Sequence, residues 1–131
     1  MDMSTGQQKH ILIAEDEKPY LRALVLKMQN AGFKVTGAEN GVETLAALKK
    51  ERFDLLLLDL IMPKVNGFMV LEEIKKLGLK LPVIVLSNLS QADDEKKVRD
   101  LGAVDFLGKS NTPIAELTEK VKALIGGIKN A

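Results

Sequence analysis

The chain has 131 residues, a formal net charge of +1, no cysteine and no tryptophan. This length suits one domain, the near-neutral charge gives no bulk attraction to nucleic acid or membranes, and the lack of cysteine excludes disulfides and thiolate metal sites. Because no apolar run reaches membrane-spanning length and no secretory signal is visible, we expect a cytoplasmic protein that contacts neither membrane nor, directly, nucleic acid.

In the first half of the chain, apolar runs alternate with helical patterns. Unbroken apolar runs predict strands, and apolar residues at intervals of three and four predict helices. In order, we expect a disordered leader at 1–8, a strand at 10–14, a helix from Pro19 to Gly32, a strand at 33–38 and a helix from Asn40 to Lys49, with one domain at 9–127. The first strand runs directly into three acids, Glu15, Asp16 and Glu17.

The central run has four leucines, Leu55 to Leu58, followed by Asp59. A short apolar run bounded by turn residues is typical of a strand that is buried on both faces. A helix is the competing interpretation, but the run is short and Pro63 ends it. Asp59 is therefore expected at the carboxyl end of a central strand, the edge where open α/β sheets bind ligands. A carboxylate that caps a loop is the plain alternative for this residue alone.

The second half continues the alternation. We expect a helix at 66–77, a strand at 81–86 followed by Ser87, a helix at 91–101, a strand at 103–107 followed by Gly108 and Lys109, and a last helix with Thr112 as N-cap and Pro113 as first residue. The inner face of the last helix is predicted to hold Ile114, Leu117, Val121, Leu124 and Ile125. Alternating strands and helices predict an α/β fold: a single-domain, doubly wound, five-stranded parallel sheet with helices on both faces.

Polar groups follow four of the predicted strands: Glu15 and Asp16, then Asp59, Ser87 and Lys109. In a parallel sheet these ends share one edge, so we expect the side chains to converge. Crowded carboxylates raise one another's pKa unless a cation lies among them, and oxygen ligands without His or Cys suit Mg²⁺. An aspartate beside such an ion can act as a nucleophile toward phosphorus, with the hydroxyl and ammonium groups binding phosphoryl oxygens. The alternative is a set of unrelated polar loop residues.

Taken together, these motifs resemble the response-regulator receiver domain, the chemotaxis-messenger type of fold. The matching features are the acid pair Glu15-Asp16 after Ile-Leu-Ile-Ala, Asp59 in Leu-Leu-Leu-Leu-Asp-Leu-Ile-Met-Pro, the downstream Gly67, Ser87 after Val-Ile-Val-Leu, and Lys109 after Asp-Phe-Leu-Gly. The match runs from about residue 9 to residue 125. The resemblance implies a flavodoxin-like (βα)5 sheet with strand order 2-1-3-4-5.

The resemblance also implies a phosphorylation site. Asp59 would accept a phosphoryl group from a sensor histidine kinase or a histidine phosphotransfer protein. Mg²⁺, with Mn²⁺ as a substitute, would be bound by Asp16, Asp59 and the backbone carbonyl of Ile61, and Glu15 would act directly or through water. Such a protein assists its own phosphorylation and dephosphorylation but is not a turnover enzyme on an external substrate.

A second implied group reads out the phosphorylated state. Lys109 would pair with the phosphoryl oxygens, Ser87 would close on them, and Phe106 corresponds to the switch aromatic of the family. Asn88 and Met62 are expected to modulate the site. Phosphorylation would change the surface of the fourth helix, fifth strand and fifth helix for an unknown downstream protein, in a monomer or weak dimer. We expect Phe106 to sample an inward position even without phosphate, because it has no hydroxyl to satisfy.

Four positions depart from the usual pattern of the family. Glu15 stands where aspartate is usual, Asn88 where a small residue is usual, and Ser110 where proline is usual, and Phe106 lacks a hydroxyl. A cis bond before a residue other than proline costs about 3–4 kcal/mol, so we expect a trans bond between Lys109 and Ser110.

Other function classes are less well supported. A receiver-like interaction module that is not phosphorylated is the main alternative, although the intact acids and lysine favour the switch. A small-molecule phosphatase would usually carry a second acid at the position of Ile61. A nucleotide-binding protein is disfavoured because no glycine-rich loop follows the first strand.

Overall fold

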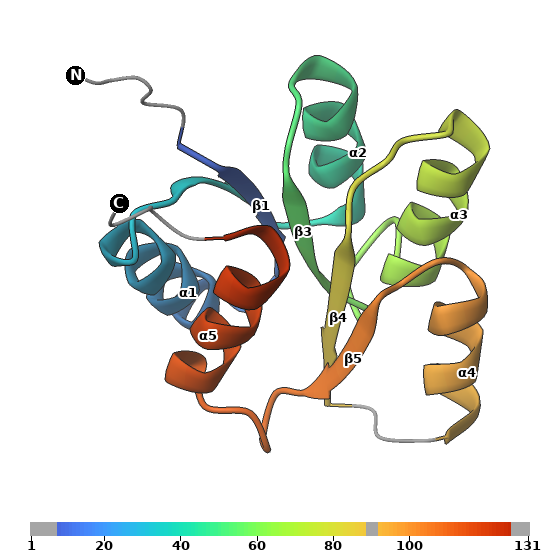
Figure 1. Ribbon diagram of the computed structural model, residues 1–131. Coiled ribbons are helices and arrows are strands. Elements are labelled where there is room, and N and C mark those ends of the chain that lie inside the picture. The colour runs from blue at the N-terminus through green and yellow to red at the C-terminus, as the bar shows by residue number, and fades with distance from the viewer. Residues whose placement is uncertain (1–7, 89–91, 127–131) are drawn as a thin grey trace.

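The computed structural model of the protein describes residues 8–88 and 92–126, in which five strands alternate with five helices (Figure 1). The elements are β1 (His10–Ala14), α1 (Lys18–Asn30), β2 (Lys34–Ala38), α2 (Gly41–Lys50), β3 (Leu55–Asp59), α3 (Gly67–Leu77), β4 (Val83–Ser87), α4 (Ala92–Asp100), β5 (Asp105–Gly108) and α5 (Ile114–Ile125). All strand pairs are parallel, and the order is β2-β1-β3-β4-β5. The predicted fold class and strand order are confirmed.

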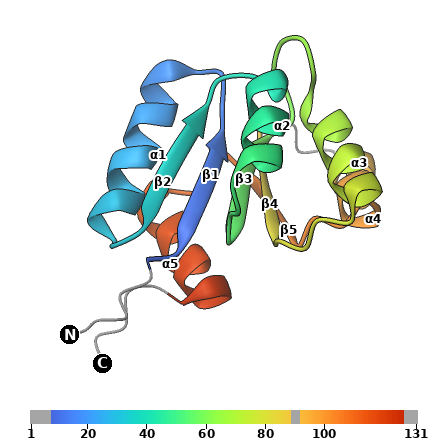
Figure 2. The same ribbon diagram turned by 90° about the horizontal axis from the view of Figure 1, so that it is seen from above.

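The helices form two layers around the sheet. Helices α1 and α5 cover one face, and α2, α3 and α4 cover the other (Figures 1 and 2). Side chains alternate across a strand, so Leu56 and Leu58 of β3 pack in the core beneath α2–α4, whereas Leu55 and Leu57 pack beneath α1 and α5. All four leucines are fully buried. Burial stabilises each by roughly 1.5–3 kcal/mol, which fixes the register of the strand that carries Asp59.

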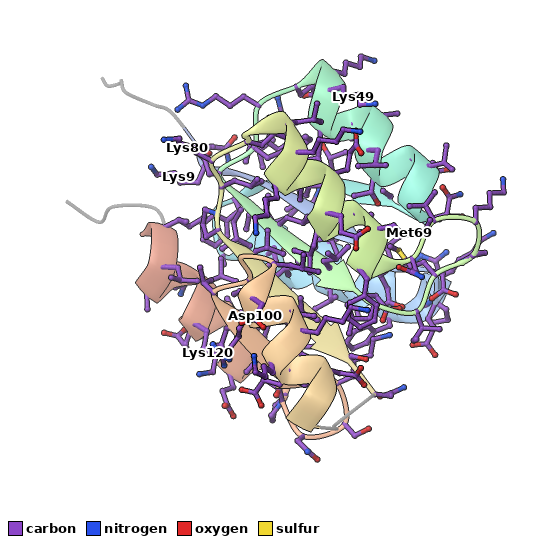
Figure 3. The ribbon with its side chains drawn as sticks, turned by 90° about the vertical axis from the view of Figure 1, so that its right-hand side faces the viewer. Lys9, Lys49, Met69, Lys80, Asp100 and Lys120 are labelled. Carbon is purple, nitrogen blue, oxygen red and sulfur yellow. The ribbon has the colours of Figure 1, made fainter. Side chains whose placement is uncertain are left out.

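Asparagine side chains start two of the helices. Asn40 Oδ1 accepts a hydrogen bond from the Glu43 N–H at 2.8 Å, and Asn66 Oδ1 accepts one from the Met69 N–H at 3.0 Å. Each therefore satisfies an amide that has no partner inside its helix. The predicted helix starts are confirmed, with the asparagines as N-caps. Figure 3 looks onto the α2–α4 face, where Met69 lies at the end at which α3 begins and Lys80 lies toward the opposite edge.

The start of the last helix differs from the prediction. Thr112 is not its N-cap: Pro113 holds that position and α5 begins at Ile114. Leu124, predicted on the inner face, is 46% exposed, whereas Thr118 is buried and its hydroxyl donates to the Ile114 carbonyl at 2.8 Å. A threonine whose hydroxyl bonds the preceding turn brings no unpaired polar group inside, so it can take an inner position that the apolar pattern did not assign to it.

Three strands also differ from their predicted bounds. Strand β2 begins at Lys34 rather than at residue 33. Strand β4 begins at Val83 rather than at residue 81, after Pro82, which has no N–H to donate, and it includes Ser87. Strand β5 covers 105–108 rather than 103–107.

The predicted leader at 1–8 lies outside the described residues except for Gln8, whose side-chain amide donates to the Gly32 carbonyl at 3.1 Å. Within the described ranges, no helix has the length and apolar character needed to cross a membrane.

Gly67 brings the start of α3 against the end of β3. A Cβ at this position would lie 2.6 Å from the Asp59 carbonyl oxygen and 2.7 Å from Leu60 Cα. The Gly67 N–H donates to the Leu60 carbonyl at 2.9 Å. No side chain fits there, so glycine allows the close approach that fixes the loop after Asp59.

Candidate functional site

Parallel pairing brings the predicted polar residues to one edge of the sheet. β1 pairs with β3, β3 with β4 and β4 with β5, so Glu15 and Asp59 come at neighbouring strand ends, and Ser87 directly follows the partner of Asp59 on β4. The Lys109 N–H, just after β5, donates to the Ser87 carbonyl at 3.0 Å. The predicted convergence is confirmed, although these residues come from four strands that are far apart in the sequence.

Three carboxylates form the centre of this edge. Glu15, Asp16 and Asp59 each offer an oxygen, and these oxygens lie within 4.8 Å of one another. Glu15 is 1% exposed and Asp59 is 3% exposed, whereas Asp16 faces solvent. Two buried acids and one exposed acid therefore line a site that opens to solvent on the Asp16 side.

Lys109 is the cation that faces these acids. Its Nζ lies 2.8 Å from Glu15 Oε1, 2.9 Å from Glu15 Oε2 and 3.3 Å from Asp59 Oδ2, and its side chain is 9% exposed. Glu17, which is not one of the three central acids, also places its Oε1 2.9 Å from the same nitrogen. Burial alone would lower the pKa of Lys109, but hydrogen bonds to Glu15 and Glu17 and the charge of Asp59 raise it above its ordinary value. The lysine is therefore charged at neutral pH.

Asp59 is held in a more protonated form than an ordinary aspartate. Burial and then the negative charge of Glu15 raise its pKa from 3.8 to about 7. Lys109 and the Ile61 N–H, which donates to Asp59 Oδ1 at 3.2 Å, act in the opposite direction but do not cancel the effect. The crowding of carboxylates predicted from the sequence therefore has the expected consequence for this residue.

The donor set fits a hard divalent cation. Three carboxylates supply oxygen ligands, and one ammonium group leaves their combined charge incompletely neutralised. Mg²⁺ prefers oxygen ligands and keeps several waters, which suits a site that is open on one side. Among the described residues, no other group of three acidic or histidine side chains brings its ligand atoms this close together.

The remaining predicted residues differ in how far they are buried and in what they pack against. Ile61 is 57% exposed, and its backbone lies beside Asp59 through the bond given above. Ser87 is fully buried at the end of β4. Met62 is buried in the core beneath α2–α4, so any influence on the site acts through packing of the loop. Phe106 is half-buried and packs against the same core.

The loop after β5 has the predicted peptide geometry. The bond between Lys109 and Ser110 is trans, as expected for a residue other than proline. The Ser110 hydroxyl donates to Asn88 Oδ1 at 3.4 Å, and both residues are exposed. Asn88 therefore lies on the rim of the site, next to the loop that carries Lys109.

Glu17 and Tyr20 contact Lys109 but were not assigned to the site from the sequence. The Lys109 Nζ lies 5.2 Å from the centre of the Tyr20 ring, within the range of a cation–π contact. Glu17 was visible as the third acid after β1, and Tyr20 lies in the first turn of α1. Nothing in the sequence indicated that the start of this helix would turn these side chains toward a lysine about 90 residues later.

Comparison with known proteins identifies related sequences over almost the whole described chain. The family model of the response regulator receiver domain matches residues 11–122. The transcriptional regulatory protein YkoG of Bacillus subtilis is 34% identical over 119 residues, which cover 91% of this chain and 52% of YkoG. The alkaline phosphatase synthesis transcriptional regulatory protein PhoP of the same species is 30% identical over 117 residues, covering 89% of this chain and 48% of PhoP.

The chain thus spans about half the length of these curated relatives. Their names describe transcriptional regulators, so they give no support to the expectation that nucleic acid is not contacted directly.

Solved structures share the fold. The receiver domain of the Francisella response regulator 1452 superimposes with a TM-score of 0.85 at 28% identity, covering 90% of this chain and 97% of that one. The response regulator TrrA of Thermotoga maritima, solved with Mg²⁺ and BeF, gives a TM-score of 0.79 at 32% identity, covering 89% and 99%.

The raised pKa of Asp59 predicts a pH dependence of stability in the metal-free protein. Between pH 4 and about pH 7 the folded state holds a proton that the unfolded state has lost, so the free energy of unfolding should fall as pH rises, by at most about 1.4 kcal/mol per pH unit. Above about pH 7 this contribution to the slope ends. Asp59→Asn should remove it and be more stable than the wild type at pH 8. Urea unfolding in the presence of a chelator across this pH range measures both effects. If the free energy of unfolding changes with pH equally in the two proteins, the raised pKa does not belong to Asp59.

Proposed function

The chain belongs to the response regulator receiver domain family, and we propose that it is a phosphoryl-accepting signalling switch with Asp59 as the acceptor. The observation that carries this proposal is the position of Asp59: a buried carboxylate at the sheet edge, between Glu15 and Lys109. Receiver domains act as signalling switches rather than as metabolic enzymes.

The proposed reaction is a transfer from phosphohistidine. An Asp59 carboxylate oxygen attacks phosphorus, the O–P bond forms, the N–P bond breaks, and its electron pair stays on the imidazole nitrogen, which is protonated as it leaves. The nucleophile must be ionised, and a pKa of about 7 leaves much of Asp59 protonated in the metal-free site. A bound cation is therefore part of the proposal.

The residues proposed to hold that cation are Asp16, Asp59 and the backbone carbonyl of Ile61, with Glu15 acting directly or through water. Bound Mg²⁺ would supply positive charge that favours the ionised carboxylate and offsets the charge of the phosphoryl oxygens. The close oxygens of the three acids support this assignment, as does the Mg²⁺ in the solved TrrA complex. Mn²⁺ is expected to substitute.

Lys109 and Ser87 are proposed to bind the phosphoryl oxygens. Lys109 already contacts Asp59 Oδ2 at 3.3 Å, so an oxygen of a phosphoryl group on that residue would be within its reach. Charge-assisted hydrogen bonds of this type are among the strongest in proteins. The Lys109 N–H donates to the Ser87 carbonyl, which brings the end of β4 next to the residue that carries the ammonium group.

Buried charge favours the switch over an interaction module that is never phosphorylated. Taking Glu15, Asp59 and Lys109 out of water costs several kcal/mol per ion unless the geometry offsets it. An interaction module has no use for these groups, because apolar residues of similar size would stabilise the same sheet edge as well or better. A phosphoryl acceptor requires them.

The face formed by α4, β5 and α5 is proposed to carry the output. Asp105 of β5 lies 3.4 Å from Arg99 Nη2 of α4 and 4.0 Å from Lys120 Nζ of α5, so one carboxylate contacts both helices. The neighbouring Phe106 is half-buried beneath α4. A shift of Ser87 toward a phosphoryl group would open space for this ring, and the ion pairs around Asp105 would rearrange with it.

The proposed partners are a sensor histidine kinase or histidine phosphotransfer protein upstream and an unidentified protein or output domain downstream. The curated relatives are about twice as long and carry names of transcriptional regulators, which supports control of transcription as the output of the proposed switch. A cytoplasmic location and a monomer or weak dimer stay predictions.

Phosphorylation should map to Asp59 and depend on Mg²⁺. Incubation with a small phosphodonor such as phosphoramidate, followed by mass mapping, should find the phosphoryl group on Asp59 alone. Asp59→Asn and chelation of Mg²⁺ should each abolish the modification, and Glu72→Gln, an exposed change on α3, should leave it unchanged. Modification of Asp59→Asn at the wild-type rate would refute the acceptor assignment.

The ring of Phe106 should report the switch. NMR signals of this ring are expected to show more than one environment in the free protein and to shift toward one of them with beryllofluoride and Mg²⁺. The signals of Phe33, which is buried beneath α1 and α5, provide an internal control that should not change. A Phe106 ring that is unaffected by beryllofluoride would exclude it from the output.

A further inference from the structure

The three N–H donors of the Lys109 ammonium group are matched by three carboxylates. It carries three N–H bonds and contacts three carboxylates: Glu15 at 2.8–2.9 Å, Glu17 at 2.9 Å and Asp59 at 3.3 Å. A phosphoryl group on Asp59 would bring new oxygens to the same corner. Lys109 can bind one of them well only if one of its present partners gives way.

Exposure decides which partner can leave. Glu15 is 1% exposed, and its Oε2 also accepts the Glu17 N–H at 2.9 Å, so it is fixed inside the site. Asp59 is the residue that would carry the phosphoryl group. The Glu17 side chain is 58% exposed and can return to water without leaving a buried charge unpaired.

We propose that Glu17 is a positioning residue that holds Lys109 in the unphosphorylated protein and competes with the phosphoryl group for it. This inference rests on the proposed phosphorylation of Asp59. Formation of the phosphorylated state then includes exchange of the Glu17 carboxylate for a phosphoryl oxygen on the lysine. Glu17 thereby lowers the affinity of the site for phosphoryl-like anions.

The surroundings of Glu17 support this role. Glu17 occupies the N-cap position of α1, yet its side chain makes no capping hydrogen bond and contacts Lys109 instead. A cavity of about 350 Å³ adjoins the pair and is lined by Glu17, Pro19, Tyr20, Asn88, Lys109 and Ser110. The carboxylate therefore has open space beside it, and an anion that enters through this cavity meets Glu17 next to the lysine.

Two substitutions separate the contact with Lys109 from general charge repulsion. Glu17→Gln keeps the shape and removes the charge. Glu17→Asp keeps the charge but is one methylene shorter, and aspartate at an N-cap can bond the helix amides instead of Lys109. Glu119→Gln is the matched control, because it removes an exposed carboxylate that pairs with Lys122 on α5.

Beryllofluoride with saturating Mg²⁺ is the probe, and Tyr20 is the reporter. Tyr20 is the single tyrosine in a chain without tryptophan, and its ring lies beside Lys109, so its fluorescence should follow the titration. The rise in Tm with beryllofluoride gives the same affinity independently. Exposed ion pairs contribute roughly 0.2–1 kcal/mol, so both Glu17 variants should bind beryllofluoride about 1.4- to fivefold more tightly than the wild type. Glu119→Gln should bind as the wild type does.

The outcomes separate this inference from the proposed function. Wild-type affinity in Glu17→Gln would overturn the role of Glu17. Tighter binding in Glu17→Gln but not in Glu17→Asp would also overturn it, because the effect would then come from charge alone. A wild-type protein that neither binds beryllofluoride nor accepts phosphate on Asp59 would instead remove the proposed function, and this inference with it.

Discussion

The site depends on an excess of negative charge that the fold holds at one edge of the sheet. Glu15 and Asp59 are buried there, Asp16 and Glu17 border them, and Lys109 is the cation that contacts three of these four acids. Burial, and then the negative charge of Glu15, raise the pKa of Asp59 to about 7, and the single ammonium group does not cancel this effect. In the proposed switch, this excess negative charge favours a divalent cation, and the bound cation would in turn favour a phosphoryl group on Asp59.

The rest of the fold holds this arrangement in place. The apolar residues of β3 are buried on both faces of the sheet, so the strand cannot shift its register without moving leucines out of the two cores. Gly67 lets α3 press against the end of the same strand, where a side chain would collide with the Asp59 backbone. Packing therefore keeps Asp59 facing Lys109 although the charges alone would favour separation of the acids.

Much of the fold and of the candidate site could be predicted from the sequence, because each pattern that indicates them lies within a short stretch of residues. The leucine run indicates the central strand, and Asp59, the acids after β1, Ser87 of β4 and Lys109 after β5 each stand at or next to a strand end, which a parallel sheet brings together. The contacts of Glu17 and Tyr20 could not be predicted, since they depend on the angle at which α1 leaves the sheet. Leu124 was predicted on the inner face of α5 but is exposed, and Thr118 is buried although the apolar pattern gave it no inner position, because its hydroxyl can bond its own helix.

The central claim is that the acids form one cation site in the folded protein. The most direct test is the free energy of unfolding with and without Mg²⁺ at matched ionic strength. Mg²⁺ at a hundredfold excess over its Kd should raise this free energy by about 2.7 kcal/mol, since only the folded state brings the three acids together. Asp16→Asn, which removes the exposed acid, should weaken the effect. Stability that does not respond to Mg²⁺ in the wild type would contradict the account.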